Sequence, residues 1–186
     1  MKRAWILCVA IAVLAVPSVA SASVSPTDFK NAAKFCKALR ADMGPALFKQ
    51  TYGTNKNKSN AFGKCVSKNA HTVDEIHSDA VKQCKAEREA NPSAFASKYG
   101  SSNKPDNEHG KGDDRNALGK CVSQKQRELR GDERDAIENA ARTCRTERNA
   151  DRAAFAEKYG TNDNDRNAFG KCVSKTVRTE EQTNPS

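Results

Sequence analysis

The sequence predicts an all-α fold made of three tandem helical modules, each with about three short helices and one stapling disulfide. The nine-residue phrase "NAFGKCVSK" at 60–68 returns as "NALGKCVSQ" at 116–124 and as "NAFGKCVSK" at 167–175. Between these phrases, apolar residues recur at steps of three and four, the period of a helix with one buried face. Each phrase also carries one cysteine, which suggests one cross-link in each module.

The first 22 residues have the features of a secretory signal. A basic start precedes an apolar run that ends at Val16, and Ala20-Ser21-Ala22 matches the small-residue pattern of a signal-peptidase site. The run is too short for a membrane span, which needs about 20 residues, so a retained anchor is only the alternative. Cleavage after Ala22 removes Cys8 and leaves an even number of cysteines, as in an exported disulfide framework. We expect a secreted or extracytoplasmic protein of the cell envelope, with no later membrane span.

The cysteines align the mature chain into three repeats. Repeat 1 covers 23–71, repeat 2 covers 72–131 and repeat 3 covers 132–180, and we expect a disordered tail at 181–186. The loop 101–115 of repeat 2 is nine residues longer than the loop 54–59 of repeat 1. Such insertions usually lie at exposed loop tips.

The first helix of repeat 1 is predicted from about Thr27 to Asp42. Its apolar face consists of Phe29, Ala32, Ala33, Cys36 and Leu39. Related positions in the other repeats are Ile76, Ala80, Val81 and Cys84, and Ile137, Ala140, Ala141 and Cys144. Thr72 and Glu75 fit a capping box, which predicts that a new helix starts at Thr72.

The second helix of each repeat is short. Pro45 and Pro92 suit a first helical position, where the missing N–H of proline is harmless. A phenylalanine and a tyrosine four residues apart project from one face, and we expect these pairs to pack in the core: Phe48 and Tyr52, Phe95 and Tyr99, Phe155 and Tyr159. The glycines that follow are expected to end the helix in a left-handed conformation: Gly53, Gly100 and Gly160.

The third helix begins within the repeated phrase. Asparagine is a good N-cap residue, and it opens each copy: Asn60, Asn116 and Asn167. In repeat 1 the apolar face is formed by Phe62, Cys65 and Val66. A glycine recurs three residues into the phrase and suggests that helices approach closely there: Gly63, Gly119 and Gly170.

Six cysteines allow fifteen pairings, and we predict Cys36–Cys65, Cys84–Cys121 and Cys144–Cys172. Closing a loop of about 30 residues stabilises the fold by roughly 3.5 kcal/mol in the chain-entropy model. The rival pairing joins Cys65 to Cys84, Cys121 to Cys144, and Cys36 to Cys172. A continuous helix would hold Cys65 and Cys84 about 28 Å apart, although a turn near Thr72 could bring them together.

The pattern "YGTN…NAFGKCVS" resembles repeats of exported bacterial proteins to which no activity is attached. The resemblance covers most of the mature chain. It implies a shared fold family and nothing about function.

No motif in the sequence indicates catalysis, a cofactor or a metal. Histidine occurs only as His71, His77 and His109, and no cysteine pair has the close spacing typical of a metal site. The segment "TNDNDRN" resembles a calcium loop faintly, but it lacks the glycine and the terminal glutamate, and Lys56 and Lys58 stand at the matching places in repeat 1. We therefore expect no enzyme, no cofactor and no metal site.

Positive charge is concentrated in repeat 1. Without Lys2 and Arg3 the chain has 30 Lys and Arg against 23 Asp and Glu. The net charge is +7 in repeat 1 (9 against 2), +1 in repeat 2 (11 against 10) and −1 from residue 132 onward (10 against 11). Possible anion-binding residues are Lys30, Lys34, Lys37, Lys56, Lys58, Lys64 and Lys68. The alternative is an ordinary solvated surface.

The sequence favours a non-enzymatic exported repeat protein with a structural or protein-interaction role. The alternative is a cationic binder of nucleic acid or an anionic cell-surface polymer. For that alternative, we expect binding to map to repeat 1, to weaken as salt rises, and to depend on Lys30, Lys34 and Lys37.

Overall fold

The computed structural model describes residues 26–100, 114–162 and 164–183, and every regular element in these ranges is a helix. In chain order the helices are α1 (Pro26–Met43), α2 (Pro45–Tyr52), α3 (Ala61–Ala90), α4 (Pro92–Tyr99), α5 (Asp114–Ala150), α6 (Arg152–Tyr159) and α7 (Ala168–Thr183). The all-α prediction is therefore confirmed. The secretory signal, most of the repeat 2 loop with His109, and one residue of the segment "TNDNDRN" lie outside the described residues.

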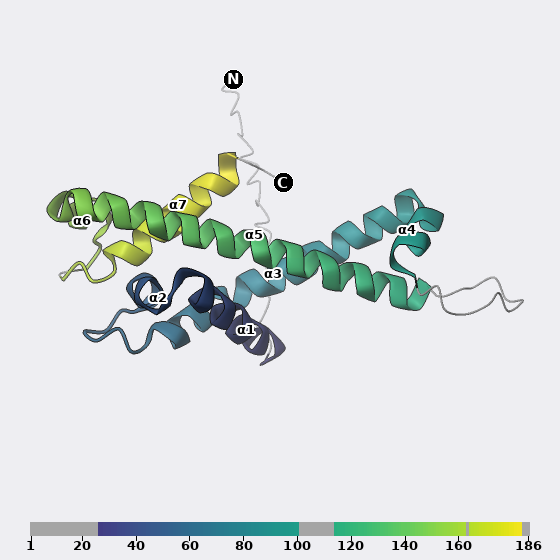
Figure 1. Cartoon of the computed structure of the whole chain (residues 1–186), viewed down its shortest axis with the longest axis horizontal. Helices are drawn as coiled ribbons and strands as arrows, with labels where there is room; N and C mark the ends of the chain where they lie inside the picture. Colours follow the sequence, from purple (N-terminus) through teal and green to yellow (C-terminus); the bar gives the residue numbers. More distant parts are fainter. Residues whose placement is uncertain (1–25, 101–113, 163, 184–186) are drawn as a thin grey trace, which may run out of the picture.

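The long helices α3 and α5 each belong to two repeats. The third helix of repeat 1 runs without interruption into the first helix of repeat 2, and the two together form α3. Helix α5 joins repeats 2 and 3 in the same way, so the boundaries at 71/72 and 131/132 lie inside helices. Figure 1 shows these two helices crossing.

The predicted helix start at Thr72 is wrong. A capping side chain acts only where the backbone leaves the helix, and nothing in the sequence forces it to do so here. No glycine or proline occurs between Gly63 and Pro92. The buried stripe also continues across Thr72 at steps of three and four, through Cys65, Asn69, Val73, Ile76, Ala80 and Cys84.

The predicted disulfide pairing is confirmed. The bonds are Cys36–Cys65, Cys84–Cys121 and Cys144–Cys172, with Cα–Cα distances of 6.0, 5.9 and 6.0 Å. The rival pairing is wrong because Cys65 and Cys84 lie on one continuous helix. Such a helix separates residues 19 positions apart by about 28 Å. Structural disulfides of this kind are typical of proteins that fold in an oxidising compartment.

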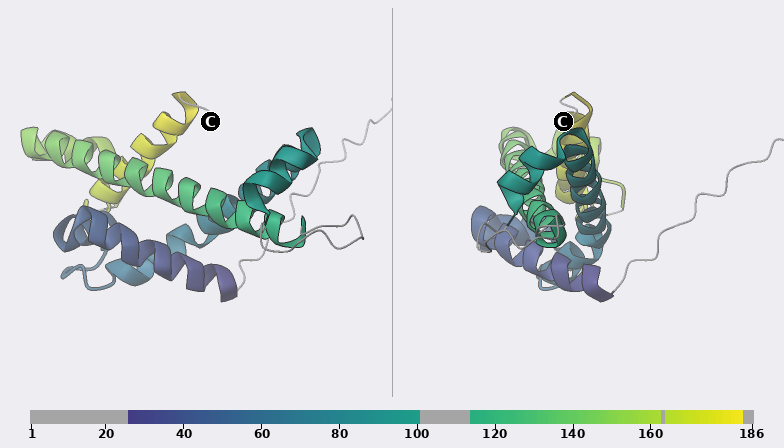
Figure 2. Two further views of the ribbon diagram at one scale, coloured as in Figure 1. Left: turned by 45° about the vertical axis from the view of Figure 1, so that its right-hand side comes forward. Right: turned by 90° about the vertical axis from the view of Figure 1, so that its right-hand side faces the viewer.

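Repeats 1 and 3 share one hydrophobic core. In a single cluster, Phe35, Leu39 and Phe48 of repeat 1 join Ile137 and Phe169 of repeat 3. Helix α1 packs on α5, and α2 packs on α7. Figures 1 and 2 show α2, α6 and α7 gathered at one end of the crossed long helices.

Repeat 2 forms a separate tip at the other end of the molecule, where α4 lies (Figure 1). Its small core consists of Cys84, Phe95, Tyr99, Ala117 and Cys121. Repeat 2 lies between repeats 1 and 3 in the sequence. The direct packing of repeat 1 on repeat 3 is therefore not suggested by the order of the repeats.

The aromatic pairs pack inside the protein as predicted. Their ring centroids lie 5.1 Å apart in repeat 1, 4.9 Å in repeat 2 and 4.8 Å in repeat 3, and all six rings are buried. Phe29 differs from its prediction. It is 45% exposed, and Phe35 instead faces the core from α1.

Several helix ends differ from the predictions. Pro45 and Pro92 do start α2 and α4. Gly53, however, has φ −72° and is not left-handed, and the glycines ending α4 and α6 are similar. Glycine is needed there for space, because a Cβ on Gly53 would lie 2.6 Å from the Lys49 carbonyl oxygen.

The third helix begins after Asn60 and Asn167 as predicted, but the Asn60 side chain accepts no hydrogen bond from the first turn of α3. Asn60 accepts a hydrogen bond from the Thr54 N–H at 3.0 Å and donates one to Thr54 Oγ1 at 2.7 Å, so it braces the preceding loop. Asn116 lies inside α5. The described side-chain caps are instead Asn91 on α4 and Asp151 on α6. Helix α7 also extends to Thr183, into the segment predicted to be a disordered tail.

Candidate anion-binding groove

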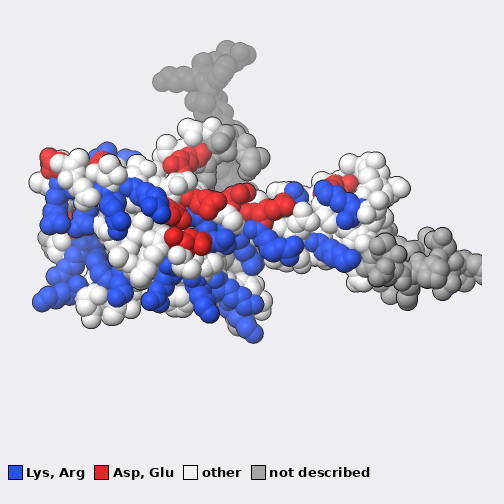
Figure 3. All heavy atoms as spheres, viewed as in Figure 1, with Lys and Arg blue, Asp and Glu red and all other residues white. Residues whose placement is uncertain are grey.

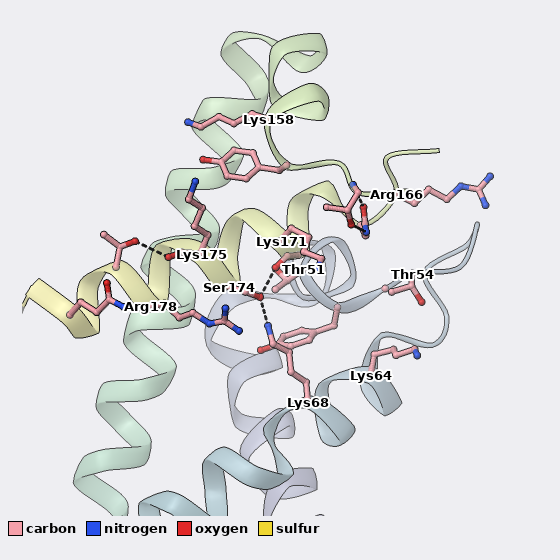
Figure 4. A pocket seen from close by; sticks show the side chains of 18 residues that line it. Thr51, Thr54, Lys64, Lys68, Lys158, Arg166, Lys171, Ser174, Lys175 and Arg178 are labelled. Carbon is pink, nitrogen blue, oxygen red and sulfur yellow. Dashed lines mark hydrogen bonds between the residues drawn. The ribbon is translucent and has the colours of Figure 1, made fainter. Parts of the chain in front are cut away.

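A groove with a volume of about 770 Å³ opens between repeats 1 and 3 (Figure 4). The end of α2, the following loop and the first turns of α3 form the repeat 1 wall. The end of α6, the loop that follows it and one face of α7 form the repeat 3 wall. Seven described lining residues are cationic: Lys64, Lys68, Lys158, Arg166, Lys171, Lys175 and Arg178.

Helix spacing directs most of these cations into the groove. Lys64 and Lys68 are four residues apart on α3, so they project from one face. Lys171, Lys175 and Arg178 follow the same rule on α7. In both helices the residue after the first lysine is a buried half-cystine, and the disulfide on the inner side orients the lysine face outward.

Polar contacts join the two walls. Lys68 Nζ on α3 donates a hydrogen bond to Ser174 Oγ on α7 at 2.5 Å. Lys58 Nζ donates to the Gly53 carbonyl at 2.7 Å and to the Arg166 carbonyl of the facing loop at 3.3 Å. These contacts hold the repeat 1 loop against the loop of repeat 3.

Backbone packing brings the walls closer at Gly170. A Cβ at this position would lie 2.8 Å from the Thr51 carbonyl oxygen, so α7 rests directly on α2. The sequence-based inference of close helix approach is therefore correct at Gly170. It is wrong at Gly63 and Gly119, where a Cβ would meet nothing within 4 Å.

No described residue lining the groove is Asp or Glu. One groove cation has an ion-pair partner in the described chain: Lys158 Nζ lies 2.6 Å from Glu147 Oε1. Figure 3 shows blue side chains gathered at the repeat 1 and 3 end, and red ones over the middle of α5. The sequence places Asp132, Glu133 and Asp135 in that part of α5. Repeat 3 therefore has balanced charge as a whole but a cationic groove face.

The like charges in the groove affect one another. Desolvation of the Lys68 amine, with the nearby Arg178, lowers the pKa of this lysine, and Glu133 opposes the shift. Lys68 as a residue is still exposed, so solvent reaches its side chain. Its Nζ lies 5.9 Å from the centroid of the Tyr52 ring, and Lys175 Nζ lies 6.0 Å from that of Tyr159. The two walls thus present equivalent lysine and tyrosine pairs.

Repeat 1 lacks an ionic contact that repeats 2 and 3 share. In repeat 3, Glu147 holds Lys158 and accepts a hydrogen bond from the Tyr159 hydroxyl at 3.0 Å. Repeat 2 has the same arrangement of Glu87, Lys98 and Tyr99. In repeat 1 the glutamate and lysine positions are occupied by Leu39 and Thr51, both buried. Neutral side chains suit these two positions, because both are buried in repeat 1.

The predicted anion-binding lysines separate into three groups. Lys64 and Lys68 line the groove, and Lys58 bridges its two loops. The other four are exposed but do not line the groove: Lys30, Lys34, Lys37 and Lys56.

The repeat 3 wall was not among the predicted anion-binding residues. Lys171 and Lys175 occupy the same positions in the repeated phrase as Lys64 and Lys68, so the phrase itself carried the signal. Summing charge over each repeat concealed it, because the acids of repeat 3 lie elsewhere on the repeat.

The cysteines, Tyr52 and the histidines of the described chain show no arrangement that indicates catalysis or metal binding. All six cysteines of the predicted framework are disulfide-bonded. Burial raises the pKa of Tyr52 to about 12, so its phenol stays neutral near pH 7. His71 and His77 are exposed, and the described residues contain no cluster of His, Cys, Asp and Glu able to hold a metal.

Comparison with protein-family models, with curated proteins and with solved structures finds no match to this chain. Within the described ranges, no helix combines the length and the hydrophobicity needed to cross a membrane. The geometry of the groove is therefore the main basis for assigning a function.

Proposed function

We propose that this protein is an exported, non-catalytic binding protein that holds an anionic polysaccharide in the groove between repeats 1 and 3. The observation that carries the proposal is the groove lining itself, with seven cations from two repeats and no described carboxylate. Such a surface attracts polyanions, because each anionic group that a lysine neutralises releases a condensed counterion.

The groove also offers hydroxyl groups suited to a sugar chain. Thr54, Thr161 and Thr179 lie exposed among the cations. The Thr54 and Thr161 hydroxyls each accept a hydrogen bond from an asparagine amide and can still donate. Thr179 donates to the Lys175 carbonyl and can still accept. Hydroxyls both donate and accept hydrogen bonds and can therefore pair with sugar hydroxyls. All seven cations that line the groove are exposed to solvent, as binding of a long chain requires.

A single-stranded nucleic acid fits this surface less well. Proteins that bind single strands stack the bases on accessible aromatic rings. Tyr52 and Tyr159 line the groove, but they are only 5% and 9% exposed, because their rings belong to the core. The lining thus recognises charge and hydroxyls, with little aromatic surface for bases.

The proposed location follows from two features. The N-terminal sequence has the pattern of a secretory signal. The second feature is the set of three disulfides, which are typical of proteins from an oxidising compartment. We propose that the mature chain acts outside the cytoplasm, where acidic polysaccharides of the envelope or surroundings are accessible.

The test is calorimetric binding of the oxidised chain 23–186 to a sulfated heparin oligosaccharide at 50 and 200 mM NaCl. We expect binding at low salt and a loss of affinity of about tenfold or more at the higher salt. Single-stranded DNA of equal charge is the comparison ligand. Absence of binding to the oligosaccharide at 50 mM, salt-independent binding, or clearly tighter binding to DNA would each contradict the proposal.

A further inference from the structure

A second, smaller hollow lies beside the groove, between the α2 end of repeat 1 and the junction of α5 and α6. It has a volume of about 310 Å³. Arg148, Arg152 and Arg166 of repeat 3 line it together with Lys58 of repeat 1. Arg166 also lines the large groove, so the two sites are continuous through this residue.

The arginines of this hollow have no ionic partner in the described chain. Neither Arg148, Arg152 nor Arg166 forms a salt bridge with a described carboxylate, and Arg148 is half-buried. Asp165 is the one described acid of the lining, and its carboxylate is directed at Gly160, where a Cβ would lie only 2.1 Å from Oδ1.

The positive charges around the hollow are close enough to lower one another's pKa values. Desolvation and the adjacent Arg148 and Arg166 lower the pKa of Lys58. Desolvation and Arg152 likewise lower the pKa of Arg148. The folded protein therefore holds together cations that repel one another, and a bound anion would relieve this cost.

Two helix ends affect the electrostatic potential of the hollow in opposite directions. Arg148 lies in the last turn of α5, where the helix dipole favours a cation. The dipole of α5 explains the position of Arg148, but it does not explain why four cations surround one hollow. Ala168 and Phe169, the first residues of α7, also line the hollow, so the positive end of this helix dipole lies beside it.

We propose that this hollow binds a tetrahedral oxyanion, a sulfate or phosphate ester carried by the polysaccharide in the groove. A guanidinium group presents parallel N–H donors that match two oxygens of such an ester. Three arginines line the hollow from different segments, and such an ester offers three terminal oxygens, whereas a carboxylate has only two. The hollow would thus distinguish sulfated or phosphorylated chains from purely carboxylated ones. The inference rests on the proposed function and specifies its ligand.

The test compares a heparin oligosaccharide with its fully desulfated form, which keeps the carboxylates on the same backbone. We expect the double variant R148Q/R152Q to lose at least tenfold in affinity for the sulfated probe and less than threefold for the desulfated one. The control K30Q/K34Q removes the same charge from the exposed face of α1 and should change both affinities less than threefold. Circular dichroism and the oxidised mass verify that each variant is folded and disulfide-bonded.

The outcomes separate the two proposals. If the unaltered chain binds neither probe, the proposed function and this inference both fail. If it binds and R148Q/R152Q loses equally for both probes, or loses nothing, the groove stands and the ester pocket is refuted. If R148Q/R152Q loses affinity selectively for the sulfated probe, competition by inorganic sulfate and inorganic phosphate at constant ionic strength shows which ester is preferred. Failure of both ions to compete, with no shift of the Arg148 and Arg152 side-chain NMR signals, would also refute the pocket.

Discussion

At the scale of single residues, equal positions in the three repeats have different roles. Gly170 lets α7 rest on the Thr51 carbonyl, whereas the equivalent glycines face open space. Leu39 occupies the position of Glu87 and Glu147. A repeated sequence predicts which secondary structure forms at each position. It does not predict which copy will be covered by a neighbour, because that depends on how the repeats pack.

The glycines provide a matched pair of substitutions. Gly170→Ala places a methyl 2.8 Å from the Thr51 carbonyl and should destabilise the fold by about 1–3 kcal/mol, as overpacking does. Gly119→Ala adds its methyl in open space within α5 and should stabilise the fold by about 0.5–1 kcal/mol. Urea unfolding measures both. Equal effects of the same sign would contradict the close approach of α7 to α2.

The Glu147 contacts predict a pH dependence. The hydrogen bond from Lys158, with one from Tyr159, holds the pKa of Glu147 below its usual range. The folded state is therefore stabilised at pH values above the ordinary carboxyl pKa, and this stabilisation is lost as pH falls through the lowered pKa. Glu147→Gln should lower the urea midpoint at pH 7, and the two midpoints should converge as pH falls below the ordinary carboxyl pKa and through the lowered pKa of Glu147. A constant difference across this range would exclude the ionic contribution.

At the scale of helices, the sequence predicts most of the elements and misplaces several ends. The period of three and four residues locates the buried stripe around each cysteine, although Phe29 and Phe62, which were predicted to belong to it, are exposed. The prolines locate the starts of α2 and α4. The fusion of helices into α3 and α5 was missed, because Thr72 and Glu75 resemble a cap locally while the buried stripe continues past them. Where no residue breaks the helix and its apolar face continues, the helix runs through a sequence that resembles a cap.

Substitutions at Thr72 test the continuity of α3. As an interior residue, Thr72→Ala should change stability by less than about 0.5 kcal/mol. Thr72→Pro should cost about 3 kcal/mol or more, because it removes a helical hydrogen bond and clashes with the preceding turn. A true N-cap would give a different result, a loss of about 0.5–2 kcal/mol for Thr72→Ala. Thermal unfolding followed by circular dichroism distinguishes these cases.

At the scale of the whole molecule, repeats 1 and 3 form one body and repeat 2 forms a tip. Neither this packing nor the groove could be predicted from charge counts, since half of the groove belongs to a repeat with no net positive charge. The disulfide pairing could be predicted from the repeats, because each repeat contains two cysteines. Helix length excludes the rival only once α3 is known to be continuous through Thr72. Packing between sequence-distant repeats is decided by surface fit, which a single sequence does not reveal.

The shared core predicts that repeat 3 is not autonomous. A fragment from Asp132 to Thr179 would expose Ile137 and Phe169, which repeat 1 helps to bury in the whole chain. We expect the oxidised fragment to show much less helix than its share of the whole chain, despite its intact Cys144–Cys172 bond. Adding an oxidised repeat 1 fragment should restore helix. Full helicity of the lone repeat 3 fragment by circular dichroism would argue against a shared core.

The most direct test of the account is salt-titrated binding of a heparin oligosaccharide by three charge-matched double variants. K64Q/K68Q alters the repeat 1 wall, K171Q/K175Q alters the repeat 3 wall, and K30Q/K34Q alters the exposed face of α1. We predict that the two wall variants lose affinity by similar factors and reduce the salt dependence by similar amounts, while the α1 variant changes little. A loss confined to the repeat 1 variants, with K171Q/K175Q binding like the unaltered chain, would contradict a groove formed by both repeats.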